Sequence, residues 1–277
     1  MGVTMTRQEF LEIKEEIINF KYSSMKYTDY DDVENFNIVL QNKNIILIYG
    51  YNNESKIYQY HWAANDEQIL RSAIETQNDN FLITFIPDEF VLGLENDGLK
   101  VWAKWNDYFK DTLEDVSCDL KYEFLNQIEA EVASEVTRSC KGQSRGFAGQ
   151  TTEWIKSWLN GTEAISTGTK NNTILISRNS LGEIVGLVCA ATYAHHSQKR
   201  PIVWIREVAV RPEYQRMGIG RKLVTQALSY GKEKGAVRGF LQADECNIYA
   251  IHLYESLGFV SNKYEAQIDM FKASENK

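Results

Sequence analysis

The chain has 277 residues, of which 43% are hydrophobic and 25% charged, so its composition is that of a globular protein with room for two domains. Its net charge is −8, and it lacks the dense basic stripe with interleaved aromatic residues that favours nucleic-acid binding. No run approaches the ~18 apolar residues of a membrane span, and the opening residues are charged throughout, unlike a signal peptide. We therefore expect a cytoplasmic protein that contacts neither nucleic acid nor membrane.

Cysteine and histidine usage argues against disulfides and metal sites. The four cysteines are scattered without a Cys-x-x-Cys pair, and the histidines do not converge at metal-ligand spacing. This pattern indicates reduced cytosolic thiols and predicts no bound metal. The cysteines are Cys118, Cys140, Cys189 and Cys246.

Charge is distributed unevenly along the chain. Residues 1–125 carry 23 acidic and 11 basic side chains, whereas residues 126–277 carry 15 acidic and 19 basic ones. The asymmetry indicates two units with different roles, although drift of surface charge would explain it as well. We predict an N-terminal domain over residues 1–118 and a second domain over residues 119–277.

The first half has an α/β pattern. A helical period over residues 6–22 precedes the strand-like runs FNIVLQ, NIILIYGY and SKIYQYHW. An amphipathic helix, NDEQILRSAIETQ, follows with Asn65 or Asp66 as its N-cap. The short strand FLITFIP and a helix that stops at Gly98 lead to an aromatic-rich strand.

From about residue 119 the order restarts. YEFLNQI has the pattern of a strand, and helices are predicted around 128–139 and 150–159. The elements after them are the hairpin strands NTILISRN and EIVGLVCAATYA, the strand IVWIREVAV, the helix GRKLVTQALSYGKEKG, the strand VRGFLQA, the helix NIYAIHLYESLG and the strand YEAQIDMF. Both halves end in a short helix, a glycine stop and an aromatic-rich strand. A duplication would explain this repeated layout, and so would the general tendency of helices to end at glycine.

One stretch carries a chemical signal. EVAVRPEYQRMGIGRKLV, residues 207–224, passes from a strand into a helix through a glycine pair. Gly218 and Gly220 have no Cβ, so their backbone N–H groups can approach an anion closely. The helix N-terminus adds free donors, and Arg216 and Arg221 add positive charge. These features predict a pyrophosphate site, although neither the Walker spacing nor GxGxxG is present and a plain helix entry is the alternative.

This stretch resembles the coenzyme-A-binding motif of the GNAT (N-acetyltransferase) superfamily, [RQ]-x-x-G-x-[GA], with Gln215, Gly218 and Gly220 at the three named places. NIYAIHLYESLGF resembles the second motif of the family, and SLGEIVGLVCAATYA resembles the two strands that precede the cofactor strand. The resemblance covers about residues 120–277, with three elements in the expected order and spacing.

The resemblance implies an α/β fold with a GNAT-like mixed central sheet flanked by helices. A second, degenerate GNAT-like α/β domain would precede it, without a cofactor loop because residues 51–92 contain no glycine. The implied co-substrate is acetyl-CoA and the implied partner is a small-molecule amine. The residues that it assigns to acyl-CoA are Gln215, Arg216, Met217, Gly218, Ile219, Gly220 and Arg221 at the pyrophosphate, Val208, Ala209 and Val210 beside the pantetheine amides, and Asn247 along the pantetheine arm.

The resemblance also implies direct attack of the amine in a ternary complex, with Tyr254 near the thioester sulfur as proton donor. An amine with a pKa near 10 must lose a proton before it attacks, and Glu207 is the candidate base, acting through water. Alternatively, Glu207 is a strand-surface carboxylate paired with Arg206 or Arg238, and Tyr254 is a core tyrosine.

Other functions remain open at this stage. A non-catalytic acyl-CoA-binding or sensing module would keep the same loop, and an acetyltransferase could act on a protein lysine or N-terminus. Cys246 would permit a covalent acyl-enzyme, but direct attack is favoured. His195 and His196 are predicted on a solvated loop, and His252 on a helix face.

Overall fold

The computed structural model describes residues 4–28, 30–52, 56–74, 80–117, 121–162, 168–195 and 201–273. The chain divides into two compact units, the first made of Met1–Trp105 and Ala266–Lys277 and the second of Asn106–Glu265. The predicted boundary between residues 118 and 119 falls outside the described residues. The observed units differ from the predicted division because two long strands, β6 (Lys100–Lys110) and β11 (Val260–Lys272), each contribute residues to both units.

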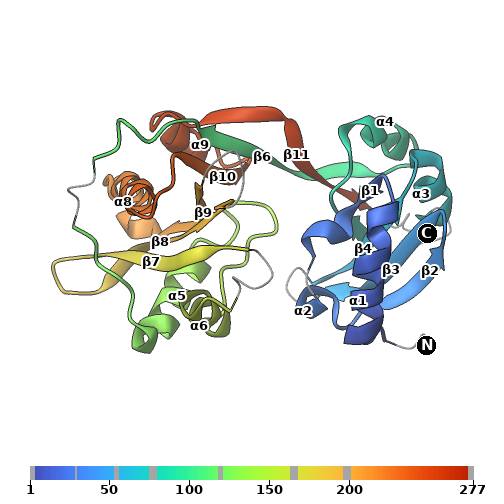
Figure 1. The fold of residues 1–277 in the computed structure, drawn as a ribbon, viewed down its shortest axis with the longest axis horizontal. Helices are drawn as coiled ribbons and strands as arrows, with labels where there is room; N and C mark the ends of the chain where they lie inside the picture. The colour runs from blue at the N-terminus through green and yellow to red at the C-terminus, as the bar shows by residue number, and fades with distance from the viewer. Residues whose placement is uncertain are drawn as a thin grey trace. The chain divides into compact units, whose positions relative to one another are not determined.

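The first unit is an α/β sandwich, labelled in Figure 1. Its sheet runs in the order β2-β3-β4-β5-β11, with the short strand β1 paired to β4. Its elements are α1 (Arg7–Glu16), η1 (Ile17–Asn19), β1 (Tyr22–Ser23), η2 (Ser24–Tyr27), α2 (Tyr30–Val33), β2 (Asn37–Asn42), β3 (Ile45–Asn52), β4 (Ile57–Ala64), α3 (Glu67–Ile74), β5 (Phe81–Ile83) and α4 (Asp88–Asn96).

The side chains of β3 alternate between the two faces of the sheet and contribute to a hydrophobic core on each face. Ile45 and Leu47 point to the face covered by α3 and α4, whereas Ile46 and Ile48 point to the face covered by α1. Successive strand residues face opposite sides, so one fully apolar strand serves both layers. Asp66 caps α3, since its Oδ1 accepts a hydrogen bond from the Ile69 N–H at 3.0 Å.

The second unit has the sheet order β7-β8-β9-β10, with β6 beside β10. Helices α5 and α6 cover one face of this sheet and α8 covers the other (Figure 1). Its elements are η3 (Gln127–Glu129), α5 (Ala130–Ser139), α6 (Thr152–Asn160), β7 (Lys170–Arg178), β8 (Ile184–Tyr193), β9 (Ile202–Val210), η4 (Pro212–Tyr214), α8 (Ile219–Glu233), β10 (Arg238–Asp244) and α9 (Ile248–Glu255).

The strand predicted over YEFLNQI is wrong. Phe124 makes a single antiparallel bridge to Leu175, and the chain then turns into η3. The side chain of Asn126 accepts a hydrogen bond from the Ile128 N–H at 3.2 Å, which caps the turn and ends the extended segment.

The two halves share one order of elements. In each, three antiparallel strands are followed by a helix, a strand parallel to the third, a second helix and a long strand. The parallel pairs are β4 with β5 and β9 with β10. The final strands are exchanged, because β11 pairs with β5 and β6 pairs with β10. Among the described residues, no helix combines the length and apolar character needed to cross a bilayer.

Candidate active site

A β-bulge in β9 sets the direction of the side chains at the site. Cys189 of β8 pairs with Glu207 and the next residue, Ala190, pairs with Ile205, so Arg206 is an extra residue on β9. A bulge of this kind interrupts the alternation of side chains along a strand. Ile205 and Val208 both pack on the α8 face, which leaves Arg206 and Glu207 together on the α5 and α6 face.

The edge of β9 that faces β10 is free over its second half. The ladder between the two strands joins Ile202–Trp204 to Arg238–Phe240. Beyond the last pair, β9 continues to Val210 and β10 to Asp244. Among the described residues, no strand pairs with this edge over residues 208–210, where only the Val210 carbonyl is occupied, by Gln215 Nε2 and Cys140 Sγ. An extended ligand with amide groups could join the edge as a strand does.

The loop after β9 presents free donors at the start of α8. Arg216 and Gly218 both have left-handed backbone angles, with φ of 64° and 81°. Gly218 is the N-cap of α8 and supplies no side-chain cap. Within the described part of the chain, the N–H groups of Met217, Gly218 and Ile219 donate to no protein acceptor. Free N–H groups at the positive end of a helix dipole are suited to bind an anion.

Side chains around this loop fix its course. Gln215 donates from Nε2 to the carbonyl of Val210 at 2.8 Å, tying the loop to the end of β9. Arg216 lies over the ring of Tyr249 at 5.1 Å from its centroid, and Arg221 donates to the Oγ of Ser256 at 2.6 Å. Both guanidinium groups thus stay beside the free donors and add positive charge there.

Glu207 is half-buried and accepts a hydrogen bond from Gln150 Nε2 at 3.1 Å. Burial raises the pKa of its carboxyl, and the charge of Arg206 and the Gln150 hydrogen bond oppose that rise. The alternative pairing with Arg238 is wrong, because Arg238 binds Asp111 with 2.6 Å between Nη2 and Oδ1. A carboxylate whose pKa is raised toward neutral is better matched to accept a proton from an amine.

Tyr254 projects from α9 and is 8% exposed. Burial raises the pKa of its phenol, and the negative charge of Glu207 raises it further. The hydroxyl therefore keeps its proton at neutral pH, as a proton donor must. Its ring also packs against Phe259 at 6.2 Å between centroids, so the core role and the donor role are compatible.

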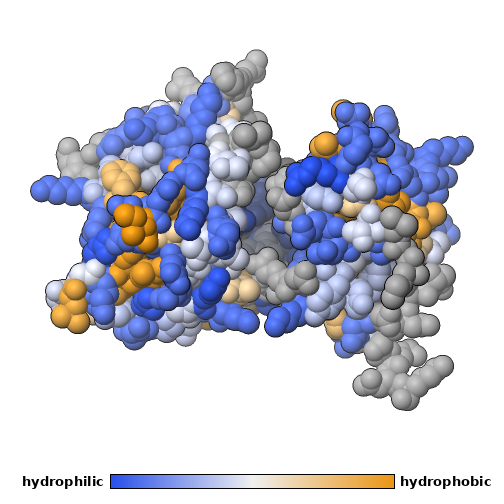
Figure 2. Space-filling view, turned by 90° about the horizontal axis from the view of Figure 1, so that it is seen from below, coloured by the Kyte–Doolittle hydropathy of each residue, from blue (hydrophilic) through white to orange (hydrophobic). Residues whose placement is uncertain are grey.

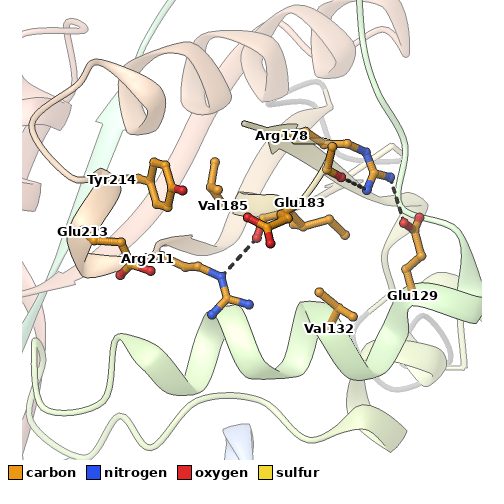
Figure 3. Close-up of a pocket in the computed structure, with 10 residues that line it drawn as sticks. Glu129, Val132, Arg178, Glu183, Val185, Arg211, Glu213 and Tyr214 are labelled. Atoms are coloured by element: carbon orange, nitrogen blue, oxygen red, sulfur yellow. Dashed lines mark hydrogen bonds and ion pairs between the residues drawn. The ribbon is translucent and has the colours of Figure 1, made fainter. Parts of the chain in front are cut away.

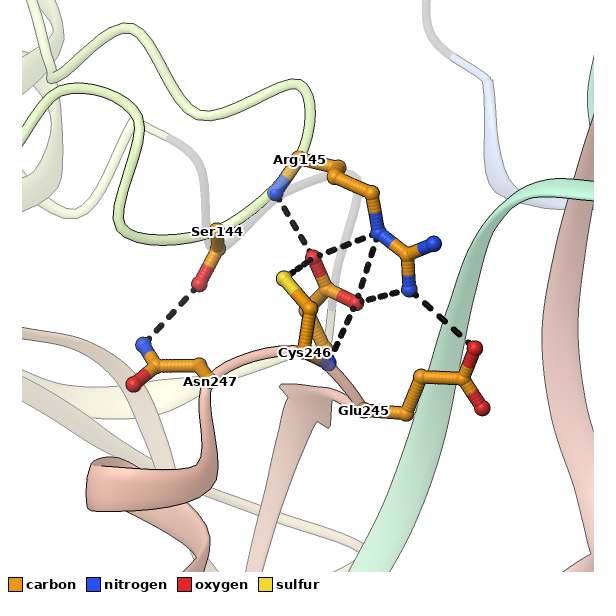
Figure 4. A network of polar contacts seen from close by, with 6 residues as sticks. Ser144, Arg145, Glu245, Cys246 and Asn247 are labelled. Atoms are coloured by element: carbon orange, nitrogen blue, oxygen red, sulfur yellow. Dashed lines mark hydrogen bonds and ion pairs between the residues drawn. The ribbon is translucent and has the colours of Figure 1, made fainter.

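Asn247 belongs to a polar network at the ends of β10 and α9 (Figure 4). Its Oδ1 caps α9 through the Ala250 N–H at 3.2 Å, and its Nδ2 donates to the Oγ of Ser144 at 3.1 Å. Beside it, the fully buried Asp244 binds the Arg145 guanidinium at 2.5 Å and the Arg145 backbone N–H at 2.7 Å. The loop between α5 and α6 is thereby fastened to the site.

Gln150, at the end of the same loop, was not apparent from the sequence. Its backbone is held by two buried hydroxyls of α5: Ser134 Oγ donates to its carbonyl at 2.6 Å, and Thr137 Oγ1 accepts from its N–H at 2.7 Å. These contacts aim the Gln150 amide at Glu207. A sequence gives no signal for a contact that joins residues 57 positions apart through a loop.

Within the described residues, the cysteine and histidine candidates make no hydrogen bond to the side chains of Glu207 and Tyr254. The Sγ of Cys246 donates to Asp244 Oδ2 at 2.9 Å, and burial and that carboxylate raise the thiol pKa, which disfavours a nucleophilic thiolate. His195 hydrogen-bonds Thr192 Oγ1 at 2.8 Å, and His252 is exposed on α9. His196, like Cys118, lies outside the described residues.

A cavity of about 460 Å³ is lined by residues of α5, β7, β8 and η4 (Figure 3). Arg178, Arg211 and Tyr214 line it, together with the carboxylates of Glu183 and Glu213. Figure 2 shows exposed apolar side chains gathered on this unit, and the exposed residues include Ile128 and Leu181. Neither Glu207 nor Tyr254 lines this cavity.

The equivalent place in the first unit is closed. Its third strand, β4, leads into α3 without a glycine, and the Asp66 carboxylate occupies the first turn of that helix. On β4, His61 is buried among Ser24, Thr28 and Gln59, and burial lowers its pKa to about 4, so it stays neutral. A negative cap at the helix start repels phosphate.

Comparison with known proteins finds a family match within the second unit. Residues 144–259 match the model of the acetyltransferase (GNAT) family. A streptothricin acetyltransferase of Streptomyces lavendulae is 29% identical over 96 residues, which are 35% of this chain and 49% of the relative. A mycothiol acetyltransferase of Thermobispora bispora is 35% identical over 79 residues, 28% of this chain and 27% of the relative. The chain thus spans less than half the length of these relatives.

A solved structure extends the likeness of fold to both units. An acetyltransferase from the GNAT family of Colwellia psychrerythraea superposes with a TM-score of 0.56 over 98% of this chain and 98% of its own. At 12% sequence identity, this likeness concerns the fold alone. The mixed central sheet flanked by helices agrees with the predicted fold class.

Proposed function

We propose that this chain, whose residues 144–259 form a domain of the acetyltransferase (GNAT) family, transfers the acetyl group of acetyl-CoA to a primary amine. The observation that carries the proposal is the placing of three features around the second half of β9. These are the free N–H groups at the start of α8, the unpaired strand edge, and the acid–base groups Glu207 and Tyr254.

The residues around β9 fit the parts of acetyl-CoA in order. The free N–H groups of Met217, Gly218 and Ile219, with Arg216 and Arg221, would hold the pyrophosphate. The predicted backbone contact from Gln215 is wrong, because its N–H donates to the Pro212 carbonyl at 3.2 Å. The free edge at Val208, Ala209 and Val210 would pair with the pantetheine amides. Asn247 uses its Oδ1 to cap α9, so its contribution to the pantetheine arm would come from Nδ2. When bound, acetyl-CoA supplies a thioester carbonyl and a thiol leaving group.

Two side chains of the protein would then accept and donate the protons of the reaction. Glu207, held by Gln150, accepts the proton of the amine through a water molecule. Tyr254 keeps its proton at Oη and donates it toward the departing sulfur. Since the leaving thiol has an intrinsic pKa near 8.5, this donation helps the reaction without being obligatory. A thiol that is held protonated at Cys246 supports direct attack over an acyl-enzyme.

The decisive experiment measures thiol release from acetyl-CoA with a panel of amines. We expect Glu207→Gln to lower kcat by ~10²- to 10⁴-fold, and Tyr254→Phe to lower it by a smaller factor. The raised pKa means that ionised Glu207 destabilises the folded state at neutral pH, so Glu207→Gln is expected to melt at no lower temperature than the parent. Cys246→Ser is the control and should retain activity.

One outcome would contradict the proposal, and a second would replace a small-molecule acceptor by a protein. Binding of CoA without turnover of any amine, with Tyr254→Phe unchanged, would indicate a sensing module. A preference for protein lysines or N-termini over every small amine would indicate a protein acetyltransferase. Intersecting initial-velocity lines would support the ternary complex, and parallel lines would favour a covalent intermediate.

A further inference from the structure

Arg206 shares a face of β9 with the candidate base. On a regular strand, adjacent residues point to opposite sides, so Arg206 and Glu207 would be separated by the sheet. The bulge removes that separation, because both residues lie between Ile205 and Val208, which pack on the opposite face. Their Cα atoms are ~3.8 Å apart along the chain, so the two charged groups start from neighbouring points.

The guanidinium of Arg206 is held by aromatic rings. It lies over Trp154 of α6 at 5.8 Å and over Trp204 of β9 at 5.5 Å, measured to the ring centroids. Cation–π contacts with two indoles restrict where the guanidinium lies and leave its N–H donors free for hydrogen bonds. The position of the Arg206 cation is thus restricted although its side chain is exposed.

No carboxylate of the described residues forms an ion pair with Arg206. The contrast with other arginines of this unit is clear, since Arg145, Arg178 and Arg238 each bind an aspartate or glutamate directly. Glu207 is directed to Gln150 instead, and Arg206 acts on it through its charge alone. An arginine that is aligned by two indoles and lacks an acid partner is suited to bind an anionic ligand.

Within the described ranges, the other groups that face Glu207 carry no positive charge. Cys189 lies opposite on β8, Cys140 approaches from α5, and Tyr254 approaches from α9. Burial raises the pKa of both thiols, so these three groups are neutral at physiological pH. In the part of the chain that the structure describes, the positive charge that acts on Glu207 comes from Arg206.

We propose that the acceptor is an amine that also carries a carboxylate, as an amino acid does, and that Arg206 binds this carboxylate while Glu207 receives the proton of the amine. The inference rests on the proposed acetyl transfer and adds the class of acceptor to it. Because Arg206 and Glu207 are adjacent on one face of β9, they fit an acceptor whose amine and carboxylate are separated by few bonds. Arg206 would then be a residue that determines specificity.

The experiment compares kcat/KM for three matched acceptors: an amino acid, its carboxamide and the amine without the carboxyl carbon. We expect the parent protein to prefer the amino acid by ~10- to 100-fold, the range that one charge-assisted hydrogen-bonded pair supplies. Arg206→Gln should remove this preference by the same factor. Because loss of the Arg206 charge also raises the pKa of Glu207, the rates are compared at a pH above the acidic limb of each variant, where kcat/KM for the carboxamide should be close to that of the parent. Arg206→Lys should restore part of it, because lysine keeps the charge without the bidentate fork.

Arg238→Gln is the matched control, since Arg238 is on the neighbouring strand and binds Asp111. It should leave the preference intact. Equal rates for the three acceptors in the parent protein, or an equal loss for all three in Arg206→Gln, would overturn the inference and leave acetyl transfer standing. If no amine is acetylated, the proposed function fails. The inference is then tested by calorimetry, which compares the affinity of the protein for the amino acid with its affinity for the carboxamide. Equal affinities would overturn the inference.

Discussion

At the scale of single residues, the contact between Gln150 and Glu207 controls the proton affinity of the candidate base. Burial raises the pKa of Glu207, and the hydrogen bond from Gln150 limits the rise by stabilising the ionised form. The hydroxyls of Ser134 and Thr137 hold the Gln150 backbone, so its amide is positioned before a ligand arrives.

Replacing Gln150 by leucine should move the pH dependence of the reaction. Without the donor, the pKa of Glu207 rises, so the base becomes protonated at a higher pH and the acidic limb of kcat/KM shifts upward. A hydrogen bond to a charged group corresponds to a shift of about one pH unit. Profiles of kcat/KM between pH 5 and 10 test this. Gln242→Leu, which removes an exposed contact to Asp107, serves as control, and an unmoved limb in Gln150→Leu would refute the role.

At the scale of elements, α8 can lie on β9 only because residue 231 is glycine. A Cβ on Gly231 would lie 2.3 Å from the Cβ of Val203. Both atoms belong to rigid parts of their elements, so neither can move aside alone. This close approach sets the distance between the last turn of α8 and the start of β9.

Gly231→Ala is therefore expected to destabilise the second unit by about 1–3 kcal/mol through overpacking, although alanine has the better helix propensity. Gly93→Ala in α4 is the matched control. Its Cβ would meet the carboxylate of Glu67, which is the end of a flexible side chain and can rotate away. Thermal unfolding monitored by circular dichroism compares the two, and a Gly231→Ala protein as stable as the parent would contradict the account.

Sequence patterns were sufficient for most elements and for the place of the glycine loop between β9 and α8. The helices α3, α4, α8 and α9 and the hairpin β7–β8 agree with the predicted segments because apolar periodicity and glycine stops are local signals. The bulge was not predicted, because its only sign in the sequence is the adjacent polar pair Arg206 and Glu207 in an otherwise apolar strand. The contact of Gln150 with Glu207 and the Arg145–Asp244 ion pair were not predicted either, because only tertiary folding brings these residues together.

At the scale of the whole molecule, the two halves repeat one order of elements, but only the second has an open helix start. The exchange of final strands explains why the predicted domain boundary differs from the observed units. The segment after Trp105 belongs to the second unit: Tyr108, Leu113 and Val116 enter its core, and Lys232 donates to the carbonyls of Glu114 and Val116.

A fragment of residues 106–265 is accordingly expected to fold more stably than a fragment of residues 119–277. The shorter start removes the part of β6 that pairs with β10 and exposes the apolar surface beneath Leu113 and Val116. Cooperative thermal unfolding and limited proteolysis of the two fragments test this. Equal stability would mean that the segment before residue 119 contributes nothing to the second unit.

The extra residue in β9 has a consequence for how such a protein can diversify. Upstream of it, β9 pairs with both β8 and β10, and downstream it pairs with β8 alone among the described strands. Arg206 is the extra residue between these two parts, so its side chain can change without altering the register of either. Under the proposed roles, a substitution at this position would change the acceptor and leave the strand edge and loop proposed for the acyl donor unaltered.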